Sequence, residues 1–205
     1  HMTRFWQADA SCCNVMLGYG IGWLSPASRD HDIPANLLSL MLARSGVIAW
    51  PESVACRSGL VDSHALPLPD VHIDRLLLAH ALEFEEEPGR LLDECWRVLD
   101  GAGRLLVVVP NRRGLWARLE HTPFGHGRPY SSRQLCQLLE THGFVPKRTY
   151  RTVCLPPLHN RVMMRFATTI ERLGQRWWPA LGGVLLVEAE KKLYAAAGNT
   201  SKLRR

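Results

Sequence analysis

The amino-acid sequence predicts an α/β protein: a three-layer sandwich in which helices cover both faces of a seven-stranded, mostly parallel sheet with an antiparallel edge strand. An apolar run at residues 14–17 ends at glycines, as a first strand ending in a turn would. Near-continuous apolar runs at 74–82 and 104–109 are typical of central parallel strands that are covered on both faces. A helical pattern separates these two runs, so together they predict a right-handed strand–helix–strand unit.

The length and composition of the chain predict one soluble globular domain. Its 205 residues are 46% hydrophobic and 21% charged, which excludes small-scaffold, fibrous and disordered classes. We expect a single domain over residues 3–197 and a flexible basic tail over 198–205, and we interpret His1 and Met2 as the remnant of a cleaved tag.

Charge and cysteine patterns narrow the partners that the sequence predicts. The longest stretch with few charges, 37–50, is shorter than the ~18 residues of a membrane span, so we expect no span and a cytoplasmic location. Six cysteines without CxxC pairing predict no metal site. The net charge of +6 is spread over the chain and not interleaved with aromatic residues, so we expect no nucleic-acid partner.

The elements of the first half follow from local signals. The first strand covers 14–17, and the second covers either 36–42, which we favour, or 47–50. A helix over 88–99 begins at a proline suited to its first turn, has one apolar face, and stops before Asp100 and Gly101.

The second half of the chain is predicted to contain two helices and two strands. Ser131 or Ser132 caps a helix that runs to about residue 142 and ends at Gly143. A strand over 144–155, a helix over 161–178 and a last strand over 183–194 follow. The last strand alternates towards its end, which suits an edge or antiparallel position.

The order of motifs from residue 60 onward carries a family resemblance. LVDSHALPLPD gives a third strand and its loop, DRLLLAHALEF a fourth strand, and LLDECWRVLDGAGRLLVVVPN a helix, turn and fifth strand. This order, and above all the Arg-Val-Leu-x-x-x-Gly run, resembles the class I S-adenosylmethionine-dependent methyltransferases, specifically the small-molecule group called methyltransferase type 11. The resemblance implies a Rossmann-like sheet and S-adenosyl-L-methionine as cofactor.

The resemblance also implies where the cofactor lies. The glycine turn would lie under its methionine and ribose, the end of the third strand beside its adenine, and the end of the fourth strand along the pocket. A side chain added at Gly20 would then enter the volume of the cofactor. Two alternatives stay open: Asp62 as a surface turn carboxylate and His80 as a buried core histidine. The implied cofactor-binding residues are Gly18, Tyr19, Gly20, Gly22, Asp62, Ser63, Ala79, His80 and Leu82.

Two positions depart from the family pattern. An acid normally ends the second strand and holds the ribose hydroxyls, but 37–42 offers only Ser39; Glu52 would substitute if 47–50 were the second strand. Met16 stands where an acid usually precedes the first glycine.

The segment after the fifth strand holds the candidate residues for the methyl acceptor. His126 or His121 is the candidate general base. The alternative is a surface lid whose polar residues only cap helices. The candidate substrate residues are Asn111, Arg113, Trp116, Arg128 and Tyr130.

The sequence therefore predicts an S-adenosylmethionine-dependent methyltransferase that acts on a small molecule, with a homodimer or a protein partner also considered. The alternative is a catalytically inactive protein of the same fold that binds a partner. A nucleic-acid methyltransferase is disfavoured, because His80, Ala81, Leu82 and Glu83 stand where such enzymes carry an Asn/Asp-Pro-Pro-aromatic tetrapeptide.

Overall fold

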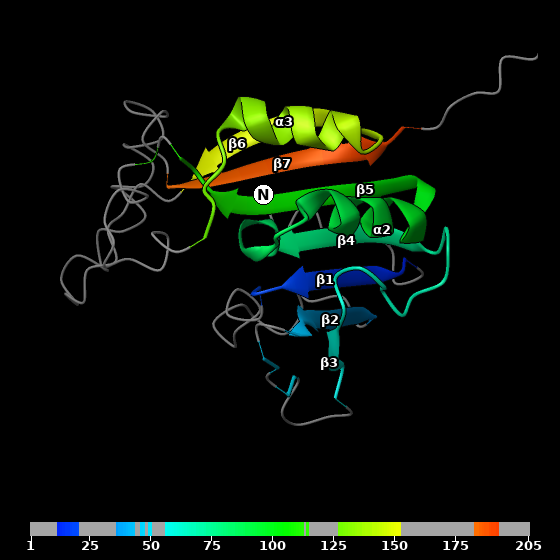
Figure 1. Ribbon diagram of the computed structural model, residues 1–205. Helices are drawn as coiled ribbons and strands as arrows, with labels where there is room; N and C mark the ends of the chain where they lie inside the picture. Colours follow the sequence, from blue (N-terminus) through cyan, green and yellow to red (C-terminus); the bar gives the residue numbers. More distant parts are fainter. Residues whose placement is uncertain are drawn as a thin grey trace, which may run out of the picture.

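The computed structural model describes residues 12–20, 36–43, 46–47, 49–50, 56–112, 114, 127–152 and 183–192. These residues form one seven-stranded sheet in the order β3-β2-β1-β4-β5-β7-β6 (Figure 1). The strands are β1 (Asn14–Gly18), β2 (Leu37–Leu42), β3 (Ser58–Val61), β4 (Ile73–Ala79), β5 (Leu99–Pro110), β6 (Phe144–Thr152) and β7 (Val184–Lys191). The helices are the short 3-10 turn η4 (Leu82–Phe84), α2 (Pro88–Val98) and α3 (Ser132–Thr141).

The sheet confirms the predicted class. Strands β1 to β5 pair in parallel, and β7 is antiparallel to both of its neighbours, β5 and β6. The antiparallel strand is therefore β7, which lies next to the edge, and β6 is the edge strand. The open alternative for the second strand is settled in favour of the first reading, since Leu37–Leu42 pairs with β1 and β3.

Both faces of the sheet are buried, as a three-layer arrangement requires. On one face, helices α2 and α3 lie side by side in front of the strands (Figure 1) and pack Leu91, Leu135 and their neighbours against Leu78 and Val107. On the other face a second apolar cluster includes Met16, Ala79 and Val108. The near-continuous apolar runs of the sequence are explained by this double burial.

The helix ends follow their predicted signals. Pro88 occupies the first turn of α2, where a missing backbone N–H costs nothing. Ser131 is the N-cap of α3: its hydroxyl accepts from the Gln134 N–H, and the Gln134 side chain accepts from the Ser131 N–H. Gly143 ends this helix with a φ of 78°. The predicted helix over 161–178 lies outside the described residues, as does the tail over 198–205.

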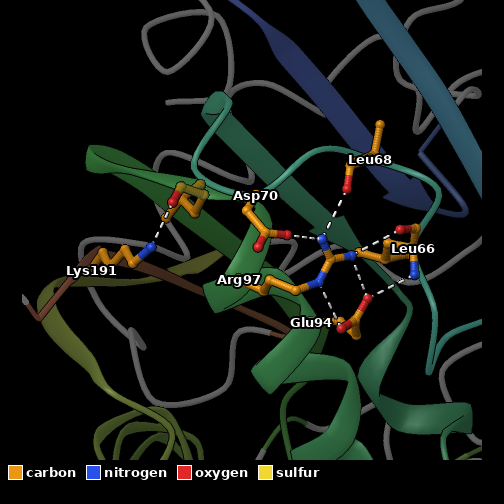
Figure 2. Close-up of polar contacts among 7 residues, drawn as sticks. Leu66, Leu68, Asp70, Glu94, Arg97 and Lys191 are labelled. Atoms are coloured by element: carbon orange, nitrogen blue, oxygen red, sulfur yellow. Dashed lines mark hydrogen bonds and ion pairs between the residues drawn. The ribbon is translucent and has the colours of Figure 1, made fainter.

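One arginine fixes the loop that joins β3 to β4 onto α2 (Figure 2). The guanidinium of Arg97 donates to the backbone carbonyls of Leu66 and Leu68, at 2.9 and 3.0 Å, and pairs with Asp70. It also forms a two-point pair with Glu94, whose Oε2 accepts from the Leu66 N–H at 2.8 Å. The Arg-Val-Leu run is therefore a structural device that positions the loop following the candidate adenine residues.

Candidate functional site at the carboxyl edge of the sheet

The glycine turn after β1 closes directly onto the end of β4. Gly18 and Ala79 are register partners, and the backbone N–H of Tyr19 donates to the Ala79 carbonyl at 2.6 Å. Gly18 has a φ of 98°, and a Cβ there would lie 2.3 Å from that same carbonyl oxygen. The turn therefore requires glycine for both its backbone conformation and its close approach. It places the backbone of residues 18–20 at the crevice edge where open α/β sheets bind ligands.

The next glycine serves packing more directly than the sequence suggested. A Cβ on Gly20 would come within 2.4 Å of Met16 Sδ and 2.9 Å of Ala79 Cβ, both atoms of the protein core. A side chain at Gly20 would therefore clash with the core itself, and its entry into the volume of the cofactor stays a prediction. Gly22 lies outside the described residues.

The end of β2 carries no acid among the described residues. Leu42 ends the strand and Ala43 follows it. Ser39 is fully buried within the strand, and its hydroxyl has no hydrogen-bond partner among the described residues. The condition for Glu52 as a substitute is not met, because β2 is Leu37–Leu42, and Glu52 itself lies outside the described residues.

The candidate adenine residues follow β3. Asp62 is exposed, and its Oδ1 accepts from the His64 N–H at 2.8 Å, which shapes the turn. The Ser63 hydroxyl donates to Glu85 Oε2 at 3.1 Å, which links this turn to the segment after β4. The ends of β3 and β4 are thus joined by a polar contact on the side where the family pattern expects the adenine.

The end of β4 brings a histidine and a buried carboxylate together. His80 Nδ1 lies 2.6 Å from Glu83 Oε1, and Glu83 is only 2% exposed. His80 is one of two non-glycine residues with positive φ in the described chain, at 52°. Its neighbours Ala79 and Leu82 are fully buried and belong to the two apolar clusters, so they form the base of the site.

The described acceptor-side residues close over this histidine and carboxylate. Asn111 and Tyr130 form an isolated bridge, and the Tyr130 N–H donates to the Pro110 carbonyl. The backbone N–H of Arg128 donates to the Glu83 carbonyl at 2.9 Å. Burial raises the pKa of the Tyr130 hydroxyl, and the charge of Glu83 raises it further, while Arg128 opposes both. Four predicted residues, Arg113, Trp116, His121 and His126, lie outside the described residues.

Glu83 is the residue that sequence reasoning missed. It follows an apolar run and comes shortly before three further glutamates, so its pattern is typical of the start of an exposed acidic stretch. The available signal was the three-residue spacing from His80, which lets the two side chains meet across one short turn.

Comparison with known proteins agrees with this geometry. A family model described as a methyltransferase domain matches residues 16–107. A probable S-adenosylmethionine-dependent methyltransferase of Mycolicibacterium smegmatis is 36% identical over 81 residues, which are 38% of this chain and 31% of the relative. A probable methyltransferase of Mycobacterium tuberculosis strain H37Rv is 37% identical over 82 residues, 39% of this chain and 30% of the relative. The chain thus spans about a third of the length of these curated relatives.

Solved structures share the fold across nearly the whole chain. A putative methyltransferase in complex with the Haloferax volcanii Trm112 methyltransferase activator has a TM-score of 0.65 at 17% identity, covering 95% of this chain and 88% of that one. A SAM-dependent methyltransferase from Archaeoglobus fulgidus has a TM-score of 0.60 at 17% identity, covering 93% and 91%. The [4+2]-cyclase SpnF also shares the fold, with a TM-score of 0.56 at 20% identity over 94% of this chain and 80% of that one. Residues 16–107 of this chain thus match a methyltransferase domain, and the strand order belongs to the fold that these solved methyltransferase structures share.

Proposed function

We propose that this chain is an S-adenosylmethionine-dependent methyltransferase that acts on a small molecule, with its cofactor over the carboxyl ends of β1, β3 and β4. The observation that carries the proposal is the contact between the glycine turn and the end of β4. There the Tyr19 N–H donates to Ala79 O, and Gly18 leaves no room for a side chain. Such a turn brings bare backbone to the crevice of a parallel sheet.

The described residues fit the cofactor at its two ends. The backbone of residues 18–20 would lie along the methionine part, and the Asp62 carboxylate would accept from the amine of the adenine, with Ser63 beside it. The fit is weaker at the ribose, since no described residue at the end of β2 offers an acid. When bound, the cofactor supplies a methyl group already activated by its sulfonium, so the protein's task is positioning.

The acceptor would lie beside the bridge between Asn111 and Tyr130, near Arg128. In this proposal Arg113 and Trp116 complete the acceptor side, and His121 or His126 remains a candidate base. None of the described helices is both long and apolar enough to cross a membrane. A single domain over 3–197 working in the cytoplasm fits these features and stays part of the proposal.

Calorimetric titration of the full chain with S-adenosylmethionine and S-adenosylhomocysteine tests the proposal. Removing the carboxylate with Asp62→Ala should weaken binding about 10- to 100-fold, the effect of losing one hydrogen bond to a charged group. His64→Ala is the matched control, because it removes an exposed neighbouring side chain and keeps the turn's backbone. Binding of neither ligand at millimolar concentration would rule the proposal out, and equal binding by both variants would leave Asp62 only its role in the turn.

A second candidate is a catalytically inactive protein of this fold that binds a partner, either another protein or a second copy of the chain. The missing acid at the end of β2 favours it. One structural neighbour is a putative methyltransferase in complex with a methyltransferase activator, and another is a [4+2]-cyclase. Proteins of this fold therefore include one that binds a partner protein and one with a different activity. Cofactor binding without methyl transfer to any acceptor, together with a stable protein complex, would support this candidate.

A further inference from the structure

We propose that His80 and Glu83 form a catalytic dyad, in which His80 takes a proton from the methyl acceptor and Glu83 orients and balances the histidine ring. The inference rests on the proposed methyltransferase function and adds a property of the acceptor: it must carry a hydroxyl or N–H proton that is lost on methylation. The two residues are called the His80–Glu83 dyad below.

Glu83 is a carboxylate kept out of water with half of its hydrogen-bonding capacity unused. Its side chain is 1% exposed; Oε1 meets His80 Nδ1 at 2.6 Å, and Oε2 is buried with no hydrogen-bond partner among the described residues. Burying a carboxylate is costly unless its oxygens are paired. Buried polar atoms left without partners are rare and call for a role. An acid that stabilises a charge appearing only during reaction is such a role.

The backbone of His80 is strained in a way that aims its ring. A φ of 52° lies in the left-handed region, which is uncommon for a residue with a side chain. The strain is held by the His80 N–H, which donates to the Val108 carbonyl at 3.0 Å on the neighbouring strand β5. The ring therefore stands directly after β4, one residue from the Ala79 carbonyl that anchors the glycine turn. Strain of this kind gathers at active sites.

The contact with Glu83 decides which ring nitrogen is basic. A carboxylate at Nδ1 favours the tautomer with its proton on Nδ1, which leaves the basic lone pair on Nε2. The side chain of His80 is 17% exposed, whereas that of Glu83 is 1% exposed. The histidine is thus the more exposed member of the dyad, and in this proposal it meets the acceptor while Glu83 supports it.

Gly127 and Tyr130 pack against the segment that carries the dyad. Gly127, at a φ of 88°, packs so closely that a Cβ would lie 3.0 Å from the Glu83 carbonyl oxygen. Tyr130 donates weakly to the Leu82 carbonyl at 3.5 Å, and its raised pKa keeps it a neutral phenol. The charge of Arg128 acts on Tyr130, and Glu85 accepts from Ser63.

The reaction step then balances. The acceptor's O–H or N–H bond breaks, and its proton goes to Nε2 of His80. The electron pair left on the acceptor forms the new bond to the methyl carbon, and the pair of the broken carbon–sulfur bond stays on sulfur. The imidazolium is stabilised by Glu83 until it releases its proton to water. A carboxylate acceptor has no proton to lose and gains nothing from the dyad.

Rates of methyl transfer from labelled S-adenosylmethionine to a panel of small acceptors test the proposal. The panel contains a phenol, an aliphatic alcohol, an aromatic N–H compound and a carboxylate. His80→Gly suits the left-handed backbone and leaves a space for imidazole. At saturating cofactor we expect it to lower transfer to proton-bearing acceptors about 100-fold or more, with partial recovery on adding imidazole. Glu83→Gln should lower the same rates at least about tenfold.

The chain offers a matched control for these variants. His142 Nδ1 also lies 2.6 Å from a carboxylate, Oδ1 of Asp93, but this pair joins α2 to the end of α3. Asp93→Asn breaks an equivalent contact away from the carboxyl edge and should leave the rates within about twofold.

The outcomes separate the dyad from the proposed function. Cofactor binding with transfer only to the carboxylate, or to none of the panel, overturns the dyad and leaves the binding result intact. Unchanged rates in Glu83→Gln, or a His80→Gly variant that imidazole does not restore, also overturn it. Failure of the wild-type protein to bind the cofactor by calorimetry removes the proposed function itself.

Discussion

A Cβ on Gly18 would lie 2.3 Å from the carbonyl oxygen of Ala79, a contact that neither backbone can relieve without breaking the pairing of β1 with β4. The turn that begins the candidate site is therefore set by the central pair of the sheet. A substitution of Gly18 would therefore affect both the stability of the sheet and the proposed cofactor site.

Gly18→Ala should lower the free energy of unfolding by at least ~2 kcal/mol, because it adds a steric clash to the strain of a φ of 98°. Gly46→Ala separates the two effects, since Gly46 also has a positive φ, 72°, but has nothing within 4 Å of its added Cβ. We expect a loss of about 1 kcal/mol there. Urea unfolding of both variants measures the difference, and equal losses would show that the contact with Ala79 adds nothing.

Arg97→Gln should destabilise the protein by about 2 to 4 kcal/mol, because it leaves the Leu66 and Leu68 carbonyls and the Glu94 carboxylate without their shared donor. Asp70→Asn is the comparison: its carboxylate is 70% exposed, so its pair with Arg97 should contribute less than about 1 kcal/mol. Denaturant titration gives both values. Similar losses in the two variants would mean that the backbone carbonyls contribute little.

The contribution of Glu94 to stability should decrease at acidic pH. Its hydrogen bonds to Arg97 lower its pKa below the ordinary 4.5, so the folded state binds fewer protons than the unfolded state in that range. The contribution is then fully present above pH 4.5 and is lost as the pH falls through the lowered pKa. The difference in unfolding free energy between the wild type and Glu94→Gln should shrink from pH 6 to ~3. A constant difference would contradict the assignment.

The contribution of Lys191 to stability should change at alkaline pH. Burial lowers the pKa of its amine below 10.5, although it donates to the Leu99 carbonyl at 2.8 Å and lies 4.0 Å from the Trp96 ring centre. Between the lowered pKa and 10.5 the folded state binds fewer protons, so its stability rises with pH. The advantage of the wild type over Lys191→Met should grow between pH 8 and ~10. Thermal unfolding at fixed ionic strength measures it, and a shrinking advantage would reverse the sign.

The sequence could predict the elements whose signals are local. The double burial of β4 and β5 appears as apolar runs, and the Ser131 cap and the Gly143 stop mark α3 because each acts within a few residues. The position of β7 between β5 and β6 could not be predicted, since alternation reports which faces are covered and not which strands are neighbours.

The backbone turn of the candidate site could be predicted from the sequence, but the side-chain contacts around it could not. A strand ending in glycines is visible as a pattern, whereas the inward direction of a Cβ on Gly20 depends on Met16 and Ala79 in three dimensions. The hydrogen bond from Arg97 to the Leu66 carbonyl joins residues that are 31 apart in the chain, and no spacing rule indicates it. Burial of Glu83 likewise depends on Gly127 folding back over it.

The place of β7 has a consequence for how the chain is made. Residues 144–152 of β6 leave the ribosome before residues 184–191 of β7, yet among the described strands β6 is hydrogen-bonded only to β7. Until the last strand arrives, β6 lacks a pairing partner and β5 presents an open apolar edge. Completion of the sheet during synthesis thus requires the insertion of one late strand, and until then the unpaired edge can pair with other chains and aggregate.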